Sequence, residues 1–104
     1  MTVETAVADV DEGFYDRADA HIYLSNDQIT GVATRGKVSA SMMYANARFS
    51  AWVSATSRES GEDMAQNREE AITFFVEQFR LMLEEHYDDY AANFDPYMRP
   101  NGNG

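Results

Sequence analysis

Apolar side chains recur at intervals of three or four residues in three long segments of the chain, which is the spacing of one face of an α-helix. The segments run over about 11–30, 37–57 and 61–93. Glycines stand at both breaks between them, and both prolines fall after residue 95. Because short connections make sequential helices antiparallel neighbours, the pattern predicts an all-α protein, a three-helix up-down-up bundle.

The helix ends carry local signals. Asp9 or Asp11 is a candidate N-cap of the first helix, and Gly31 is a candidate residue just beyond its end. The third helix opens with Ser60-Gly-Glu-Asp, which resembles a capping box. At 1.5 Å per residue this helix is about 45 Å long, against about 30 Å for each of the others. We therefore expect an over-long third helix.

The chain of 104 residues is short enough to form a single domain. Its ordered core is expected over about 11–94. Residues 95–104 end in Asn-Gly-Asn-Gly and are predicted to form a flexible C-terminal tail.

The second segment is unusually neutral. Between Val38 and Ser57 its only charged residue is Arg48, whereas a surface helix normally carries a charged face. We expect this helix to be the most buried element, with Ala47 and Ala51 close to another helix. The residues expected to be nearly fully covered are Met42, Ala45, Phe49, Trp52 and Val53.

The third segment is apolar on two sides. The main stripe, expected to face the core, contains Ile72, Phe75, Val76, Phe79, Met82, Leu83, His86 and Tyr90. Phe74 and Leu81 lie opposite this stripe, and a monomeric bundle cannot bury both sides of its longest helix. The sequence therefore favours a homodimer whose interface contains Phe74, Leu81, Tyr87 and Tyr90. The alternative is that Val3, Val7 and Val10 cover Phe74 and Leu81 within one chain.

The charge is strongly negative, with 8 basic and 18 acidic residues and a net charge of −10. Such a chain is expected to bind neither nucleic acid nor anionic membranes, whose phosphates would repel it. Residues 31–58 contain four bases and no acid, which suggests that this basic middle packs against both acidic flanks. No run approaches the length of about 18 apolar residues needed to span a bilayer, so we expect a cytoplasmic protein.

Few candidate chemical sites are present. The chain has no cysteine, which excludes disulfides and cysteine-based metal sites. The residues three before His21 and His86 are Ala18 and Leu83, so the Glu-x-x-His pairs of a carboxylate-bridged metal site are missing. Adjacent acidic residues on a helix point in different directions, so they do not face each other across a cleft. We interpret the acid pairs of this chain as solvent-exposed helix faces. We therefore expect no catalytic constellation, no metal and no cofactor.

Two places could bind an anion. Gly31-Val-Ala-Thr-Arg-Gly-Lys37 matches the first seven positions of a phosphate-binding loop, but Val38 replaces the hydroxyl residue and the loop follows a helix, not a strand. The motif is read as an interhelical loop in which Arg35 and Lys37 could still hold an anion.

The second place is Arg48. It is expected to form a structural ion pair, first with Asp19 and second with an acid of the third helix. The alternative is an anion-binding pocket formed with Tyr44, Asn46 and Trp52.

Three stretches together resemble a family of short bacterial helical proteins catalogued as a domain of unknown function. They are FYDRADAH at 14–21, RGKVSASMMY at 35–44, and the segment that runs from REEA at 68–71 to DDY at 88–90. The resemblance covers about 14–97 and implies a small helical domain of bacterial origin. It implies no catalytic or binding residue.

Three functions follow from these features. The first is a non-enzymatic, homo-oligomeric helical interaction module. The second is a small-ligand or anion-binding protein that uses Arg48 or the Arg35/Lys37 loop. The third is an acidic mimic of nucleic acid that captures a basic partner. A charge map and the mass in solution distinguish among them.

Overall fold

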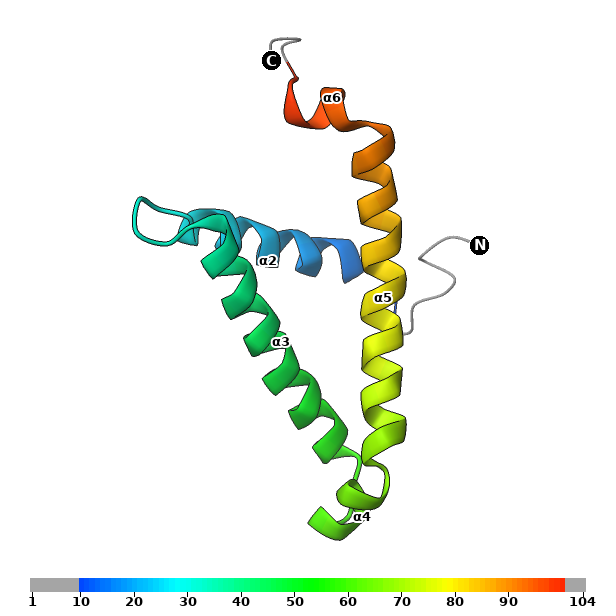
Figure 1. The fold of residues 1–104 in the computed structure, drawn as a ribbon. Coiled ribbons are helices and arrows are strands. Elements are labelled where there is room, and N and C mark those ends of the chain that lie inside the picture. Colours follow the sequence, from blue (N-terminus) through cyan, green and yellow to red (C-terminus); the bar gives the residue numbers. More distant parts are fainter. Residues whose placement is uncertain (1–9, 101–104) are drawn as a thin grey trace. The chain divides into compact units, whose positions relative to one another are not determined.

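A computed structural model describes residues 10–100, and this range contains helices and no β-strand (Figure 1). The all-α prediction is therefore confirmed for the described part of the chain. The helices are α2 (Phe14–Gln28), α3 (Arg35–Thr56), α4 (Gly61–Gln66), α5 (Arg68–Ala92) and α6 (Phe94–Met98).

The described residues fall into two compact units, residues 10–71 (the hairpin unit) and residues 72–100 (the C-terminal unit). The hairpin unit contains α2, α3, α4 and the first turn of α5. The C-terminal unit contains the rest of α5 and α6. That both belong to one domain stays a prediction.

Helix α2 begins after Gly13, which has no side chain with which to cap it. The predicted Asp11 cap is wrong, and Asp9 lies outside the described residues. The carboxylate of Asp11 instead pairs with the guanidinium of Arg17 at 2.5 Å, which lowers the pKa of Asp11. Only the backbone carbonyl of Asp11 contributes to the helix start, by accepting a hydrogen bond from the Phe14 amide at 3.2 Å.

The turn after α2 is organised by Thr30, not by Gly31. The Thr30 hydroxyl accepts hydrogen bonds from the backbone amides of Val32 at 3.2 Å and Ala33 at 3.1 Å. Gly31 does not adopt the left-handed conformation, so its predicted role at the helix end is wrong. A threonine hydroxyl that binds nearby amides makes such a turn without a left-handed glycine.

Helix α3 begins at Arg35, two residues earlier than predicted, because Thr34 caps it. The Thr34 side chain accepts a hydrogen bond from the Lys37 amide at 3.3 Å. Helices α2 and α3 form a hairpin that is closest at the connecting loop and opens away from it (Figure 1). Val38, 6% exposed, is the buried apolar residue of the described chain and lies in the first turns of α3.

The predicted third helix is broken at Asn67 into α4 and α5. The Asn67 side-chain amide donates to the carbonyl oxygen of Asp63 at 2.9 Å and to its Oδ1 at 3.0 Å. An asparagine side chain that binds the backbone in this way competes with the helix ladder, which explains the break. The predicted start at Ser60 is confirmed, because its hydroxyl accepts from the Asp63 amide at 3.0 Å.

The predicted flexible tail is wrong for its first residues, because Phe94–Met98 form α6. Pro96 lies in the first turn of this helix, where a missing N–H costs no hydrogen bond. The negative charge of Asp95, in the same turn, interacts favourably with the positive end of the helix dipole. The helix ends at Met98, just before Arg99, whose helical conformation is disfavoured by the following Pro100.

Candidate functional site

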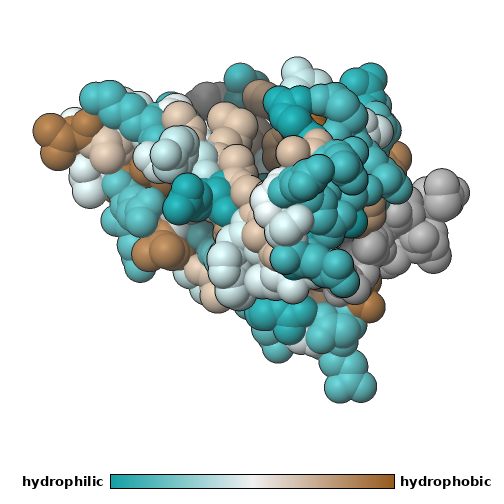
Figure 2. All heavy atoms as spheres, turned by 90° about the horizontal axis from the view of Figure 1, so that it is seen from below, coloured by the Kyte–Doolittle hydropathy of each residue, from teal (hydrophilic) through white to brown (hydrophobic). Residues whose placement is uncertain are grey.

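The apolar face of α3 is not covered by the hairpin unit. The predicted core residues are exposed, with Phe49 at 62%, Trp52 at 60% and Met42 at 38%. Ala47 and Ala51 are exposed as well. Helix α2 contacts α3 only near their loop, so α2 does not cover this face, and the prediction that α3 is the most buried element stays a prediction. Figure 2 shows hydrophobic residues at the surface among hydrophilic ones.

The main stripe of α5, predicted to face a core, is also half-exposed. Ile72 is 43% exposed, Val76 57% and Leu83 49%. Phe75 and Met82, toward one edge of the stripe, are half-buried. Within its own unit, each of the two long helices thus leaves large apolar side chains uncovered.

The four residues predicted as an interface differ in their exposure. Phe74, Tyr87 and Tyr90 are exposed, while Leu81 is half-buried. The ring of Phe74 packs edge-on against Phe75, with centroids 5.3 Å apart. Of the three valines offered as an alternative cover, Val3 and Val7 lie outside the described residues.

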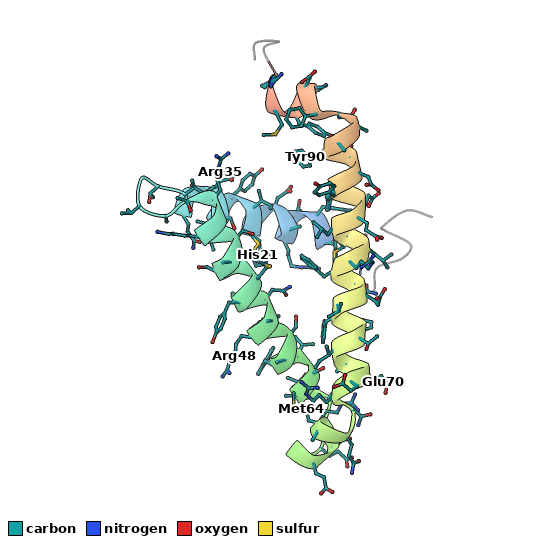
Figure 3. The ribbon with its side chains drawn as sticks, in the orientation of Figure 1. His21, Arg35, Arg48, Met64, Glu70 and Tyr90 are labelled. Atoms are coloured by element: carbon teal, nitrogen blue, oxygen red, sulfur yellow. The ribbon has the colours of Figure 1, made fainter. Side chains whose placement is uncertain are left out.

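Within the hairpin unit Arg48 forms no ion pair with Asp19, so that predicted first partner is wrong, and a partner among the acids of the third predicted helix stays a prediction. Both side chains are exposed. Asp19 lies in the half of α2 away from the loop, where α2 and α3 have diverged (Figure 1). The Arg48 side chain projects from the side of α3 (Figure 3).

The pocket proposed around Arg48 is not formed in the hairpin unit. Tyr44 is 78% exposed, and Asn46 lies about 200° around the helix from it, on the opposite side. The Asn46 side-chain oxygen accepts a hydrogen bond from the Ser50 hydroxyl at 3.2 Å, within the same helix. Arg35 and Arg48 are thirteen residues apart on α3, about 20 Å along its axis, so they do not share one site (Figure 3).

The loop of Arg35 and Lys37 uses its polar groups internally. The Lys37 ammonium donates to the Val32 carbonyl oxygen at 3.4 Å, and its backbone amide is taken by Thr34. This satisfied turn fits the interpretation of the glycine-containing motif as an interhelical loop.

The hydrogen-bonded cluster with the most partners in the C-terminal unit was missed by the sequence reasoning. The Asp89 carboxylate accepts a hydrogen bond from the Asn93 side chain at 2.9 Å and one from the Tyr97 hydroxyl at 2.9 Å. The Tyr97 ring packs on Tyr90 with centroids 4.9 Å apart. The hydrogen bond to Asp89, and then its negative charge, raise the pKa of Tyr97. Together these contacts hold α6 against the end of α5.

A sequence signal for the helix breaks did exist. Asp63 and Asn67 are four residues apart, as are Asp89 and Asn93, and these are the two Asp-x-x-x-Asn pairs in the sequence. Each asparagine donates to both the carbonyl and the carboxylate of its aspartate, and each stands between two helices.

The described residues contain neither a metal-binding cluster nor a membrane-spanning helix. No group of three or more histidine or acidic side chains within residues 10–100 is arranged to hold a metal ion. Within the same range, no helix combines the length and the apolar character needed to cross a bilayer.

The fold and these surfaces define a small all-helical protein with exposed apolar helix faces. Residues 14–91, most of the chain, match the family described as "Protein of unknown function (DUF3144)", and the chain belongs to that family. The resemblance found in the sequence is therefore confirmed. Comparisons with curated proteins and with solved structures gave no significant match.

Proposed function

We propose that the protein is a non-enzymatic helical interaction module that forms a homodimer. The observation that supports this proposal is the exposure of large apolar side chains on both α3 and α5, among them Phe49, Trp52 and Val76. Burying one such side chain fully contributes about 1.5–3 kcal/mol, so association that covers several of them is strongly favoured. Large contiguous apolar surfaces are typical of protein–protein interaction sites.

The proposed dimer completes the up-down-up bundle predicted from the sequence. In it, α2, α3 and α5 contribute their apolar faces to common cores. The second side of α5, with Phe74 and Leu81, and its C-terminal end, with Tyr87 and Tyr90, then meet the second copy. A two-fold axis suits this arrangement because the same patch serves both partners.

The remaining parts of the proposal concern partners and location. The net charge of −10 supports a module that binds neither nucleic acid nor anionic membranes. A cytoplasmic location and the absence of an enzymatic activity are part of the same proposal.

Sedimentation velocity of the wild-type protein at micromolar concentration tests the proposal. We expect a species of twice the chain mass, with a dissociation that appears on dilution. A wild-type protein that sediments as a monomer across this range would overturn the homodimer and its main support as an interaction module.

A further inference from the structure

Two separate parts of the C-terminal unit share the carboxylate of Asp89 as their hydrogen-bond acceptor. Its Oδ1 accepts from the Asn93 side-chain amide at 2.9 Å, and its Oδ2 accepts from the Tyr97 hydroxyl at 2.9 Å. Asn93 stands at the bend between α5 and α6, whereas Tyr97 belongs to α6 itself. The bend and the docking of α6 therefore depend on the same side chain.

Tyr97 attaches α6 to two neighbouring residues of α5. Its hydroxyl binds Asp89, and its ring packs on the ring of Tyr90, with centroids 4.9 Å apart. Tyr90 lies on the main stripe of α5, because it is about five full helical turns from Ile72 and so falls at the same angle around the helix. Tyr97 thus covers part of the C-terminal end of this stripe and leaves Tyr90 52% exposed.

Helix α6 is too short to be stable without these contacts. It contains five residues, and an isolated helix of fewer than about twelve residues is marginal in water. Its other support comes from Arg99, whose guanidinium lies 3.7 Å from the Asp95 carboxylate and 5.8 Å from the centre of the Phe94 ring. Contacts as exposed as these stabilise a helix only weakly. Once the contacts with α5 are lost, α6 is expected to unfold.

Pro96 decides what the released segment can become. It has no backbone N–H, and inside a continuous helix its ring would clash with the carbonyl group of Ala92, four residues earlier. A straight continuation of α5 through 94–98 is therefore disfavoured, and the chain turns aside from the axis of α5 at Asn93 (Figure 1). The alternative to a docked α6 is an unfolded segment and not a longer α5.

We propose that α6 is a strap with two states, docked and unfolded, and that Asp89 is its latch. In the docked state the strap covers part of the Tyr90 ring at the end of the α5 stripe. Loss of the Asp89 acceptor releases Asn93 and Tyr97 together and leaves Tyr90 without this cover. The strap and its latch lie within the C-terminal unit, so the proposal does not depend on what covers the rest of the stripe.

Solution NMR of the full chain tests the latch. In the wild type we expect helical Cα chemical shifts over 94–98 and nuclear Overhauser effects between the Tyr90 and Tyr97 rings, whose centroids are 4.9 Å apart. In Asp89→Ala both signals should be lost, while the shifts over 72–88 stay helical. Alanine is the best helix former, so this substitution does not itself interrupt α5.

The matched control is Asp88→Ala, which removes the same charge one residue earlier on α5. Asp88 is exposed and points about 100° away from Asp89 around the helix. This variant is expected to keep both the helical shifts over 94–98 and the Overhauser effects between the two rings. Loss of these signals in the control would show that the charge, and not the shared acceptor, holds the strap, and would overturn the latch.

A second substitution tests the role of Pro96. Adding Pro96→Ala to Asp89→Ala removes the clash with Ala92, so α5 can continue through 94–98. We expect the helical shifts over 94–98 to return in this double variant, without the Overhauser effects between Tyr90 and Tyr97. Shifts that stay unfolded would show that Pro96 does not decide the released state.

The results for Asp89→Ala decide the proposal. Ring-to-ring Overhauser effects that persist in this variant would overturn Asp89 as the latch. Loss of these effects with helical shifts retained over 94–98 would show that α6 is stable without docking, and would overturn the two-state strap. Loss of helical shifts over 72–88 as well would show that Asp89 stabilises α5 as a whole, which also overturns its role as a latch.

Discussion

The hydroxyl of Tyr97 donates a hydrogen bond to Oδ2 of Asp89 at 2.9 Å and joins the last short helix to the helix before it. The seven intervening residues include the helix break at Asn93, whose side chain donates to the other carboxylate oxygen of Asp89. Asp89 thus accepts hydrogen bonds from Asn93 at the helix break and from Tyr97 in α6. These side chains all belong to the C-terminal unit, and they hold α6 against the end of α5.

We expect the contact between Tyr97 and Asp89 to be lost at high pH. The neutral phenol is the donor, and the pKa of Tyr97 is raised above its ordinary value of 10.0. The contribution of this hydrogen bond to α6 is therefore complete below about pH 10 and disappears as the pH rises through the raised pKa. Ultraviolet absorbance of tyrosinate should show one late titration that is missing in Tyr97→Phe. If Tyr97 instead titrates together with the other tyrosines of the chain, its hydrogen bond to Asp89 is absent in solution.

Asp63→Ala is expected to destabilise α4, the short helix that connects α3 to α5. It removes the acceptor of the Glu59 amide and one acceptor of the Asn67 side chain. We expect a loss of about 1–2 kcal/mol in the free energy of unfolding, measured with urea. Glu62→Ala, one residue earlier in the same turn, is the control and should change the free energy by less than about 0.5 kcal/mol. Equal stability of the two variants would show that these hydrogen bonds contribute nothing.

The double variant Phe74→Glu, Leu81→Glu tests the second side of α5. If this side contacts the second copy, two charges at the contact should dissociate the dimer while the chain remains helical. Sedimentation and circular dichroism at the same micromolar concentration measure the two effects. A double variant that dimerises as strongly as the wild type would remove Phe74 and Leu81 from the interface.

Phe49→Ala should weaken association more than it weakens the fold of the single chain. Phe49 is 62% exposed, and its ring lies tilted against the ring of Trp52, with centroids 5.4 Å apart. Truncation of a fully buried phenylalanine would cost about 3–5 kcal/mol. We expect a much smaller loss in unfolding at concentrations where the protein is monomeric, and a clear rise in the dissociation constant. A loss of several kcal/mol in the monomer would instead place Phe49 in a core of its own chain.

The sequence by itself predicted what neighbouring residues decide. The helical spacing located the helices, and Ser60 was correctly identified as a cap, because periodicity and capping act over about four residues. The breaks at Asn67 and Asn93 are equally local. They were missed because an asparagine inside a helical pattern does not by itself indicate a break. The break follows when an aspartate stands four residues earlier and accepts hydrogen bonds from the asparagine side-chain amide.

Only the tertiary structure decided which helix faces are covered. The apolar face of α3 and the main stripe of α5 look like core in the sequence, yet Trp52 and Val76 remain exposed, and Val38 is buried where α2 meets α3. Arg48 looked like half of an ion pair, but the divergence of α2 from α3 leaves Asp19 away from it. Periodicity reports that a face must be covered. What covers it depends on the positions of residues distant in sequence, and several partners satisfy the same apolar pattern equally well.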